Sequence, residues 1–152
     1  MKRIAVYCGS NSGNNPAYVE AAEKLGAQLA REKIELVYGG GRVGLMGAVA
    51  DAALKNGGHV IGVIPEKLVI KEVIHEGLPD RRIVKTMHER KALMAELADG
   101  FIALPGGYAP FTSLRENKIV SAITAEDLPD VHGFALVKIH FVNQTLNYAD
   151  HA

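Results

Sequence analysis

Three consecutive glycines, Gly39, Gly40 and Gly41, are the residues of this chain whose type and spacing point most directly to chemistry. They follow an apolar run over residues 34–38, and a helical pattern begins at about Leu45. A phosphate can approach a glycine backbone closely because no Cβ is in the way, and the free N–H groups at a helix start favour an anion. The pattern therefore predicts a strand, a tight turn and a helix that together bind a phosphate.

A second glycine turn follows another apolar run. Residues 101–104 are typical of a buried strand, and Pro105, Gly106, Gly107 and Tyr108 come directly after it. Two such turns at the ends of neighbouring parallel strands form one crevice. We therefore expect the phosphate to lie at Gly106 and Gly107, with the first glycine turn as the opposite wall.

A third turn of small residues, Cys8-Gly9-Ser10-Asn11, comes after a predicted strand over residues 3–7. Gly9 and Ser10 either add ligand-facing backbone to the same edge of the sheet or form an ordinary loop between a strand and a helix. The sequence favours neither alternative, and both stay open.

Arg90 and Lys91 lie early in a predicted helix that begins after Thr86. Adjacent basic residues on a helix usually form a solvated face. A basic residue in the first turn, however, is unfavourable for the helix dipole, so stability gives little reason for its presence. The guanidinium presents a planar set of donors that suits phosphate or sugar hydroxyls. We therefore expect Arg90 to belong to the site, with Lys91 beside it.

Strands and helices alternate along the chain with short connections. Strands are predicted over residues 3–7, 34–38, 59–64, 82–85, 101–104 and 134–139, and helices over residues 16–31, 45–55, 86–97, 113–123 and 143–152, with a short helix between 66 and 76. The spacing of Thr86 and Glu89 is that of a capping box. This order predicts one α/β domain over residues 1–152, a Rossmann-like doubly wound parallel sheet whose closing helices are cut short at the carboxyl end.

Composition excludes several classes of function. Lys plus Arg and Asp plus Glu both number 17, so the net charge is zero and suggests neither a nucleic acid nor an anionic membrane as a partner. The longest apolar runs fall short of the ~20 residues that a membrane span requires. The single cysteine, Cys8, fits a reducing cytoplasm. The histidines have no metal-ligand spacing, and no lysine lies in a context typical of a pyridoxal phosphate anchor. We therefore expect a small-molecule ligand, no metal and no cofactor.

Several short motifs follow one another in a fixed order along residues 3–108. They are Tyr7-Cys8-Gly9-Ser10, Tyr38-Gly39-Gly40-Gly41 with Gly44-Leu45-Met46-Gly47, Gly62-Val63-Ile64-Pro65, Met87-His88-Glu89-Arg90-Lys91, and Phe101-Ile102-Ala103-Leu104-Pro105-Gly106-Gly107-Tyr108. Together they resemble the Lonely Guy family of cytokinin riboside 5′-monophosphate phosphoribohydrolases, whose bacterial members were often labelled lysine decarboxylases. The resemblance implies a Rossmann-like fold and a homodimer. It also implies hydrolysis of the N-glycosidic bond of a nucleoside 5′-monophosphate, a cytokinin riboside monophosphate or AMP, to free base and ribose 5-phosphate.

Such a reaction builds positive charge on the sugar and negative charge on the departing base, and a carboxylate beside the sugar stabilises the cation or activates water. By the resemblance, Glu72 aligns with an active-site glutamate of the family and Arg90 with an active-site arginine. Glu116 is the nearby candidate for a second glutamate, so Arg90 and Glu116 are the predicted catalytic residues. From the residues alone, Glu72 is equally well explained as an exposed charge, and Glu116 as a capping-box residue.

The sequence departs from the family pattern directly after Tyr108. The family continues with Gly-Thr and soon a glutamate, whereas this chain has Ala109, Pro110 and, at the glutamate position, Ser113. Proline has no N–H and alanine resists the dihedrals that glycine adopts, so this loop is expected to hold phosphate less well. A non-catalytic nucleotide-binding or carrier module of the same fold is therefore the main alternative.

A dinucleotide-binding domain is a further alternative. Gly39, Gly41 and Gly44 fit its fingerprint, and Glu66 could bind a ribose. Against it, the glycine turn follows the second predicted strand rather than the first, and 152 residues leave no room for a separate substrate domain.

Overall fold

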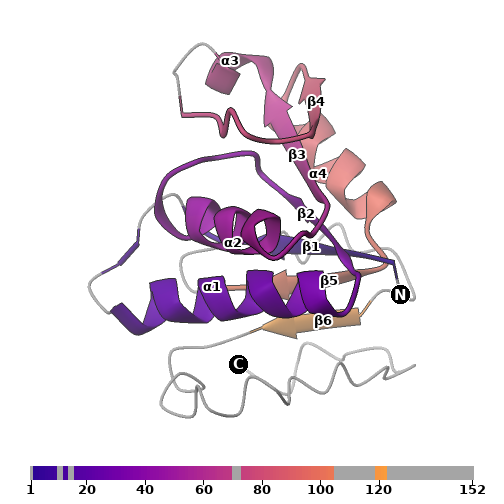
Figure 1. The fold of residues 1–152 in the computed structure, drawn as a ribbon. Helices are drawn as coiled ribbons and strands as arrows, with labels where there is room; N and C mark the ends of the chain where they lie inside the picture. Colours follow the sequence, from indigo (N-terminus) through magenta and orange to yellow (C-terminus); the bar gives the residue numbers. More distant parts are fainter. Residues whose placement is uncertain (1, 10–11, 14–15, 70–72, 105–118, 123–152) are drawn as a thin grey trace, which may run out of the picture.

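A computed structural model describes residues 2–9, 12–13, 16–69, 73–104 and 119–122 of the chain (Figure 1). Within these residues, six strands form one sheet in which every pair of neighbours is parallel. The strands are β1 (Arg3–Tyr7), β2 (Glu35–Tyr38), β3 (Val60–Pro65), β4 (Asp80–Val84), β5 (Gly100–Ala103) and β6 (Ile119–Ala122), and the helices are α1 (Pro16–Arg31), α2 (Gly44–Lys55), α3 (Glu66–Val69) and α4 (Met87–Leu97). Because the strands are parallel, their carboxyl ends share one edge of the sheet.

The strand order is β4-β3-β2-β1-β5-β6. The chain builds outward from β1 to β4 and then returns to place β5 against the other side of β1, so that Ala5 pairs with both Val37 and Phe101. This reversal between β1 and β5 is the switch point of a doubly wound sheet, the place where such folds bind ligands. The predicted fold class is therefore confirmed.

Helices cover both faces of the sheet. On one face α1 and α2 pack side by side (Figure 1), and their residues Leu25 and Val49 share a core cluster with Leu36 of β2. On the other face Met94 of α4 joins a second cluster that contains Val37. Neighbouring strand residues thus point to opposite faces, and both sides are buried. This burial explains why the strands read as continuous apolar runs rather than alternating ones.

The start of α4 is fixed by the predicted capping box. Thr86 is the N-cap residue, and its Oγ1 accepts a hydrogen bond of 3.1 Å from the backbone N–H of Glu89. The Glu89 carboxylate accepts in turn from the backbone N–H of Lys85 at 2.7 Å, one residue before the expected partner. These contacts set where the helix begins and therefore where Arg90 lies in its first turns.

Two structural predictions are wrong. The strands before the two glycine turns, β2 and β5, are not neighbours, because β1 lies between them. Their ends share an edge but flank the end of β1, a detail that apolar periodicity does not encode. The predicted helix over residues 113–123 is wrong at residues 119–122, which form β6 and pair with β5. Ile119 and Val120 are β-branched, and the pairing continues a buried sheet. The elements predicted over 134–139 and 143–152 lie outside the described residues.

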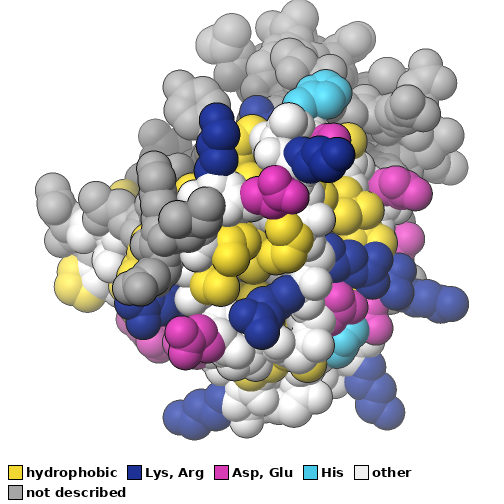
Figure 2. Space-filling model, turned by 90° about the horizontal axis from the view of Figure 1, so that it is seen from above, with side chains coloured by type: hydrophobic (Ala, Val, Ile, Leu, Met, Phe, Trp, Pro, Cys, Tyr) yellow, Lys and Arg dark blue, Asp and Glu magenta, His cyan; other side chains and the backbone are white. Residues whose placement is uncertain are grey.

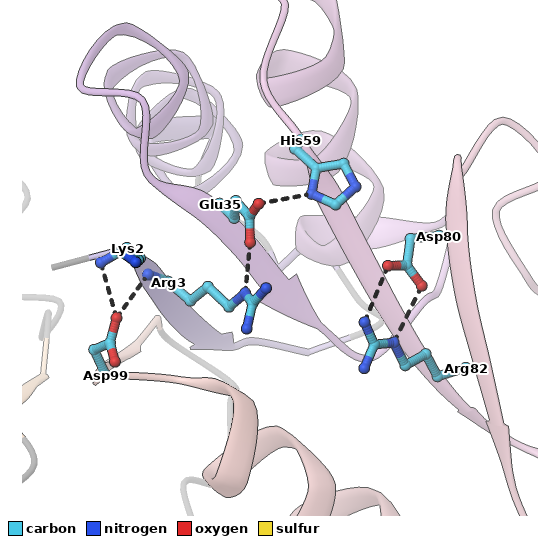
Figure 3. Close-up of polar contacts among 7 residues, drawn as sticks. All are labelled: Lys2, Arg3, Glu35, His59, Asp80, Arg82 and Asp99. Carbon is cyan, nitrogen blue, oxygen red and sulfur yellow. Dashed lines mark hydrogen bonds and ion pairs between the residues drawn. The ribbon is translucent and has the colours of Figure 1, made fainter.

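Polar contacts tie the strands together at the amino edge, opposite the glycine turns (Figure 3). The Glu35 carboxylate contacts Arg3 Nε at 2.5 Å and His59 Nδ1 at 3.2 Å. The Asp99 carboxylate accepts from the backbone N–H groups of Lys2 and Arg3 at 2.8 and 3.0 Å. These contacts join the starts of β1, β2 and β3 to the residue before β5, so they hold the register of the sheet at the edge away from the candidate site.

The surface mixes both signs of charge. Seen from above, Lys and Arg side chains alternate with Asp and Glu around a group of hydrophobic ones (Figure 2). This face, as far as it is described, has no uniformly basic area, in keeping with the zero net charge of the chain. Across the described residues, no helix combines the length and the apolarity needed to cross a membrane.

Candidate functional site

Arg90 lies at the carboxyl edge of the sheet and connects two strand ends. Its Nε donates to the carbonyl of Val63 in β3 at 3.0 Å, and its Nη2 makes a short hydrogen bond to the carbonyl of Gly39, directly after β2. The remaining terminal nitrogen, Nη1, contacts the sulfur of Met87 at 3.6 Å. The guanidinium is thus fixed by two backbone carbonyls rather than left as a solvated surface charge, and it lies at the glycine turn. The role of Arg90 in the reaction stays a prediction.

The charge of Arg90 is partly removed from water. Burial lowers the pKa of the guanidinium from its ordinary value of 12.5, while nearby Tyr7, Cys8 and Tyr38 act in the opposite direction. Arginine nevertheless stays protonated at any working pH. No carboxylate among the described residues forms an ion pair with it. A half-buried cation without an anionic partner in this part of the chain is well suited to bind an anion.

The groups around the guanidinium are neutral at physiological pH. Burial raises the pKa of the Tyr7 hydroxyl and of the Cys8 thiol to about 12 each, with Arg90 lowering both to a lesser extent. Burial also raises the pKa of Tyr38, whose hydroxyl donates to the carbonyl of Gly41 at 2.9 Å. Cys8 is therefore a protonated thiol and unsuited to act as a nucleophile.

The structure gives the three glycines a packing role. A Cβ on Gly39 would overlap Nη2 of Arg90, and a Cβ on Gly41 would lie 3.0 Å from Cε of Met46. Gly40 has a φ of +77°, and its Cβ would overlap the side chain of Ile64. The space that side chains would need is thus filled by the protein itself. A phosphate contact at Gly39, Gly40 and Gly41 stays a prediction, and sequence reasoning missed the packing explanation.

Residues 73–77, here named the cross-segment, run antiparallel across the glycine turn. The backbone N–H of Arg42 donates to the carbonyl of Val73 at 3.0 Å, and the N–H of His75 donates to the carbonyl of Gly40 at 2.8 Å. The ring of His75 contacts the Asp51 carboxylate on α2 at 2.5 Å. Sequence reasoning missed this segment, because Asp51 and His75 are 24 residues apart and no short pattern connects them.

The other predicted site residues fall into two groups. Gly9 follows β1 at the switch point, where the backbone N–H of Leu104 donates to the carbonyl of Tyr7 at 2.8 Å, and Lys91 is exposed on α4. The remaining ones lie outside the described residues, namely Ser10, Glu72, Gly106, Gly107, Tyr108 and Glu116. The structure thus brings Arg90 and Gly39 together and leaves the roles of the others as predictions.

The positions of the glycine turn and of the acidic residues bear on whether the protein could bind a dinucleotide or a metal ion. The glycine turn follows β2, whereas the switch point lies between β1 and β5, and Glu66 is an exposed residue at the start of α3. A dinucleotide fingerprint is expected at the first strand of the fold, so the dinucleotide alternative loses support. Within the described residues, no group of three or more His, Cys, Asp or Glu side chains could hold a metal ion.

Comparison with known proteins finds close sequence relatives. Residues 46–123 match the model of a family described as "Possible lysine decarboxylase". A cytokinin riboside 5′-monophosphate phosphoribohydrolase of Arabidopsis thaliana is 53% identical over 116 residues, which are 76% of this chain and 54% of that protein. One of Rhodococcoides fascians is 45% identical over 152 residues, 99% of this chain and 75% of that protein. The chain thus spans about half the length of the Arabidopsis relative.

Solved structures share the fold at lower identity. The molybdenum cofactor binding protein of Rippkaea orientalis superposes with a TM-score of 0.67 at 19% identity, over 95% of this chain and 87% of that one. The Moco carrier protein of Chlamydomonas reinhardtii gives a TM-score of 0.66 at 21% identity, over 88% and 83%. At this identity the likeness concerns the fold alone.

Proposed function

Because this chain belongs to the family described as possible lysine decarboxylases, which includes the cytokinin riboside 5′-monophosphate phosphoribohydrolases, we propose that it hydrolyses a nucleoside 5′-monophosphate. The bond cleaved is the N-glycosidic bond of a cytokinin riboside monophosphate or AMP, and the products are the free base and ribose 5-phosphate. One observation carries the proposal: the Arg90 cation is fixed at the carboxyl edge of the sheet without an ion-pair partner among the described residues.

In this proposal Arg90 binds the phosphate or the ribose hydroxyls and so orients the substrate. Arginine carries more N–H donors than the contacts to Gly39, Val63 and Met87 use, so donors remain for an oxygen of the ligand. Two backbone carbonyls fix the planar fork, which reduces the entropy lost when the substrate binds. Arg90 is thereby preorganised rather than recruited by the ligand.

The carboxylates complete the proposed chemistry. Bond cleavage leaves positive charge on the ribose, and a glutamate stabilises it or deprotonates the attacking water. Glu72 is proposed as a substrate-binding carboxylate on the strength of the family resemblance. Glu116 is proposed as the catalytic carboxylate because it is the glutamate nearest to position 113, where the family has its glutamate and this chain has Ser113. The glycines and small residues of the three turns, with Lys91, are the proposed contacts to the rest of the nucleotide. We also propose a homodimer in a reducing cytoplasm, to be tested by light scattering of the purified protein and by microscopy.

Base release from AMP and from isopentenyladenosine monophosphate tests the proposal directly. Liquid chromatography of the incubated mixture should show free base and ribose 5-phosphate. Arg90→Ala should abolish the release, whereas Arg81→Ala, which removes an exposed arginine on β4, should leave it unchanged. Turnover by Arg90→Ala at the wild-type rate would contradict the assignment.

A non-catalytic nucleotide-binding or carrier module is the second candidate. It is favoured by Ala109, Pro110 and Ser113, which stand where the family pattern has Gly-Thr and a glutamate. Calorimetry with AMP separates the two candidates, since binding without any release of base would favour the module. Binding together with release would favour the enzyme.

A further inference from the structure

The ring of His75 connects the cross-segment, residues 73–77, to helix α2. Its Nδ1 accepts from the backbone N–H of Gly77 at 3.1 Å, and its Nε2 lies 2.5 Å from the Asp51 carboxylate. A backbone N–H can only donate, so Nδ1 must be unprotonated, and the ring proton lies on Nε2 and is donated to Asp51. Both ring nitrogens are therefore in use, and the side chain is only 13% exposed.

The same residue also holds the glycine turn. The backbone N–H of His75 donates to the carbonyl of Gly40, and Gly41 pairs with Ile74 in an antiparallel bridge. The preceding carbonyl, that of Gly39, accepts from Arg90. Consecutive peptide groups thus bind the cross-segment on one side and the guanidinium on the other. The two peptide groups meet at Gly40, whose φ is +77°, so a change in the φ or ψ of Gly40 turns the Gly39 carbonyl relative to the Gly40 carbonyl.

We propose that the Asp51–His75 pair positions Arg90, by holding the cross-segment against the glycine turn whose first carbonyl binds the guanidinium. Asp51 and His75 are positioning residues and touch no substrate. The inference deepens the proposed function and rests on it for the effect on activity, but the effect on Arg90 itself is independent of any reaction.

Asp51 is the better residue to change, because its side chain is 66% exposed and its loss leaves no cavity in the core. Asp51→Ala removes the acceptor for Nε2, whereas Asp51→Asn keeps an oxygen in the same place. Glu20→Ala is the matched control, since it breaks an exposed carboxylate contact, with Lys24 on α1, that does not involve the glycine turn.

Nuclear magnetic resonance of the Nε–H group of Arg90 reports the position of the guanidinium directly. In the wild type this proton is bonded to the Val63 carbonyl and should exchange slowly. Asp51→Ala should shift the signal and raise its exchange rate about tenfold, the factor that one hydrogen bond supports. Asp51→Asn and Glu20→Ala should leave it close to the wild type. An unchanged signal in Asp51→Ala would overturn the proposal, whatever the protein does to nucleotides.

Kinetics give the second measurement. Asp51→Ala should raise the KM for AMP about tenfold and leave kcat within about twofold, because a misplaced binding group weakens substrate binding. A purely structural loss would instead reduce the active fraction, which lowers apparent kcat at constant KM, and this result would overturn the positioning role. If the wild type releases no base, the proposed function fails. The Arg90 signal and the Kd for AMP of Asp51→Ala then show whether the Asp51–His75 pair positions Arg90.

Discussion

Gly39→Ala is the sharpest test of the site, because the added methyl group is directed at Arg90. The new Cβ would overlap Nη2 and lie 2.9 Å from Cζ of Arg90 and 3.1 Å from Sδ of Met46. Gly39 is not among the glycines with positive φ, so alanine can adopt its backbone conformation. The substitution therefore displaces the guanidinium without removing the charge, by roughly 1 Å, and a misplacement of this size can lower kcat/KM about 100-fold.

The cost to stability should be smaller. The hydrogen bond to the Gly39 carbonyl involves a charged donor, and its loss costs about 1.5–3 kcal/mol. Alanine recovers about 0.4–1 kcal/mol by restricting the unfolded chain. The expected net loss is about 0.5–2.5 kcal/mol, or a decrease in Tm of roughly 1–10 °C for a chain of this size.

Gly57→Ala is the control for Gly39→Ala. Gly57 has a φ of +77° and no atom within 4 Å of the position of its Cβ, so alanine there costs about 1–2 kcal/mol of backbone strain away from the site. Base release from AMP and thermal unfolding are measured for both variants. If Gly39→Ala keeps the wild-type kcat/KM, the position of Arg90 is irrelevant to the reaction. If both variants lose activity alike, the loss reflects stability only.

Three further predictions concern charge, thiol chemistry and the loop after Tyr108. Arg3 beside Glu35 holds the pKa of that carboxyl in the folded protein below its ordinary value of 4.5. The contribution of this pair to the free energy of unfolding is therefore complete above pH 4.5 and is lost as the pH falls through the pKa of the folded state. Glu35→Gln should therefore reduce the free energy of unfolding by about 0.5–1 kcal/mol at pH 7, and this difference should shrink as the pH falls below 4.5. A difference that persists in acid would contradict the ion pair. Since burial raises the pKa of Cys8 to about 12, iodoacetamide at pH 8 should label the native thiol at least about 1,000 times more slowly than the urea-unfolded one; equal rates would refute it. Replacing Ala109 and Pro110 by Gly and Thr should tighten AMP binding in calorimetry, and an unchanged Kd would mean that the phosphate lies elsewhere.

Local patterns were enough to predict most elements of the fold. The capping box at Thr86 and the helix predicted over residues 16–31 lie where the sequence placed them, because such signals act between neighbours a few residues apart. The order of the strands in the sheet could not be predicted in this way, because nothing in the apolar run of β2 indicates that β1 lies between β2 and β5. The strand over residues 119–122 likewise depends on pairing with β5, so a nearby capping-box pattern misled the prediction.

In the candidate site, too, local features could be predicted from the sequence and contacts between distant residues could not. Arg90 was singled out because a basic residue early in a helix has little local justification, and it does lie at the glycine turn. Its partner Gly39 is 51 residues away, so the reason for the missing Cβ was invisible in the sequence. The contact between Asp51 and His75 was equally invisible, because it depends on how α2 and the cross-segment meet in three dimensions.

The central place of β1 has a consequence for synthesis on the ribosome. β1 precedes the other strands of the sheet in the chain, and β2 follows it closely enough to pair early, but the other edge of β1 waits for β5, whose Phe101 pairs with Ala5. Until β5 has been translated, this edge of β1 has no strand to pair with, and unpaired apolar strand edges attract other chains. Slow translation between α2 and β5 should therefore favour capture by chaperones or coaggregation, whereas fast completion of β5 should protect the newly made protein.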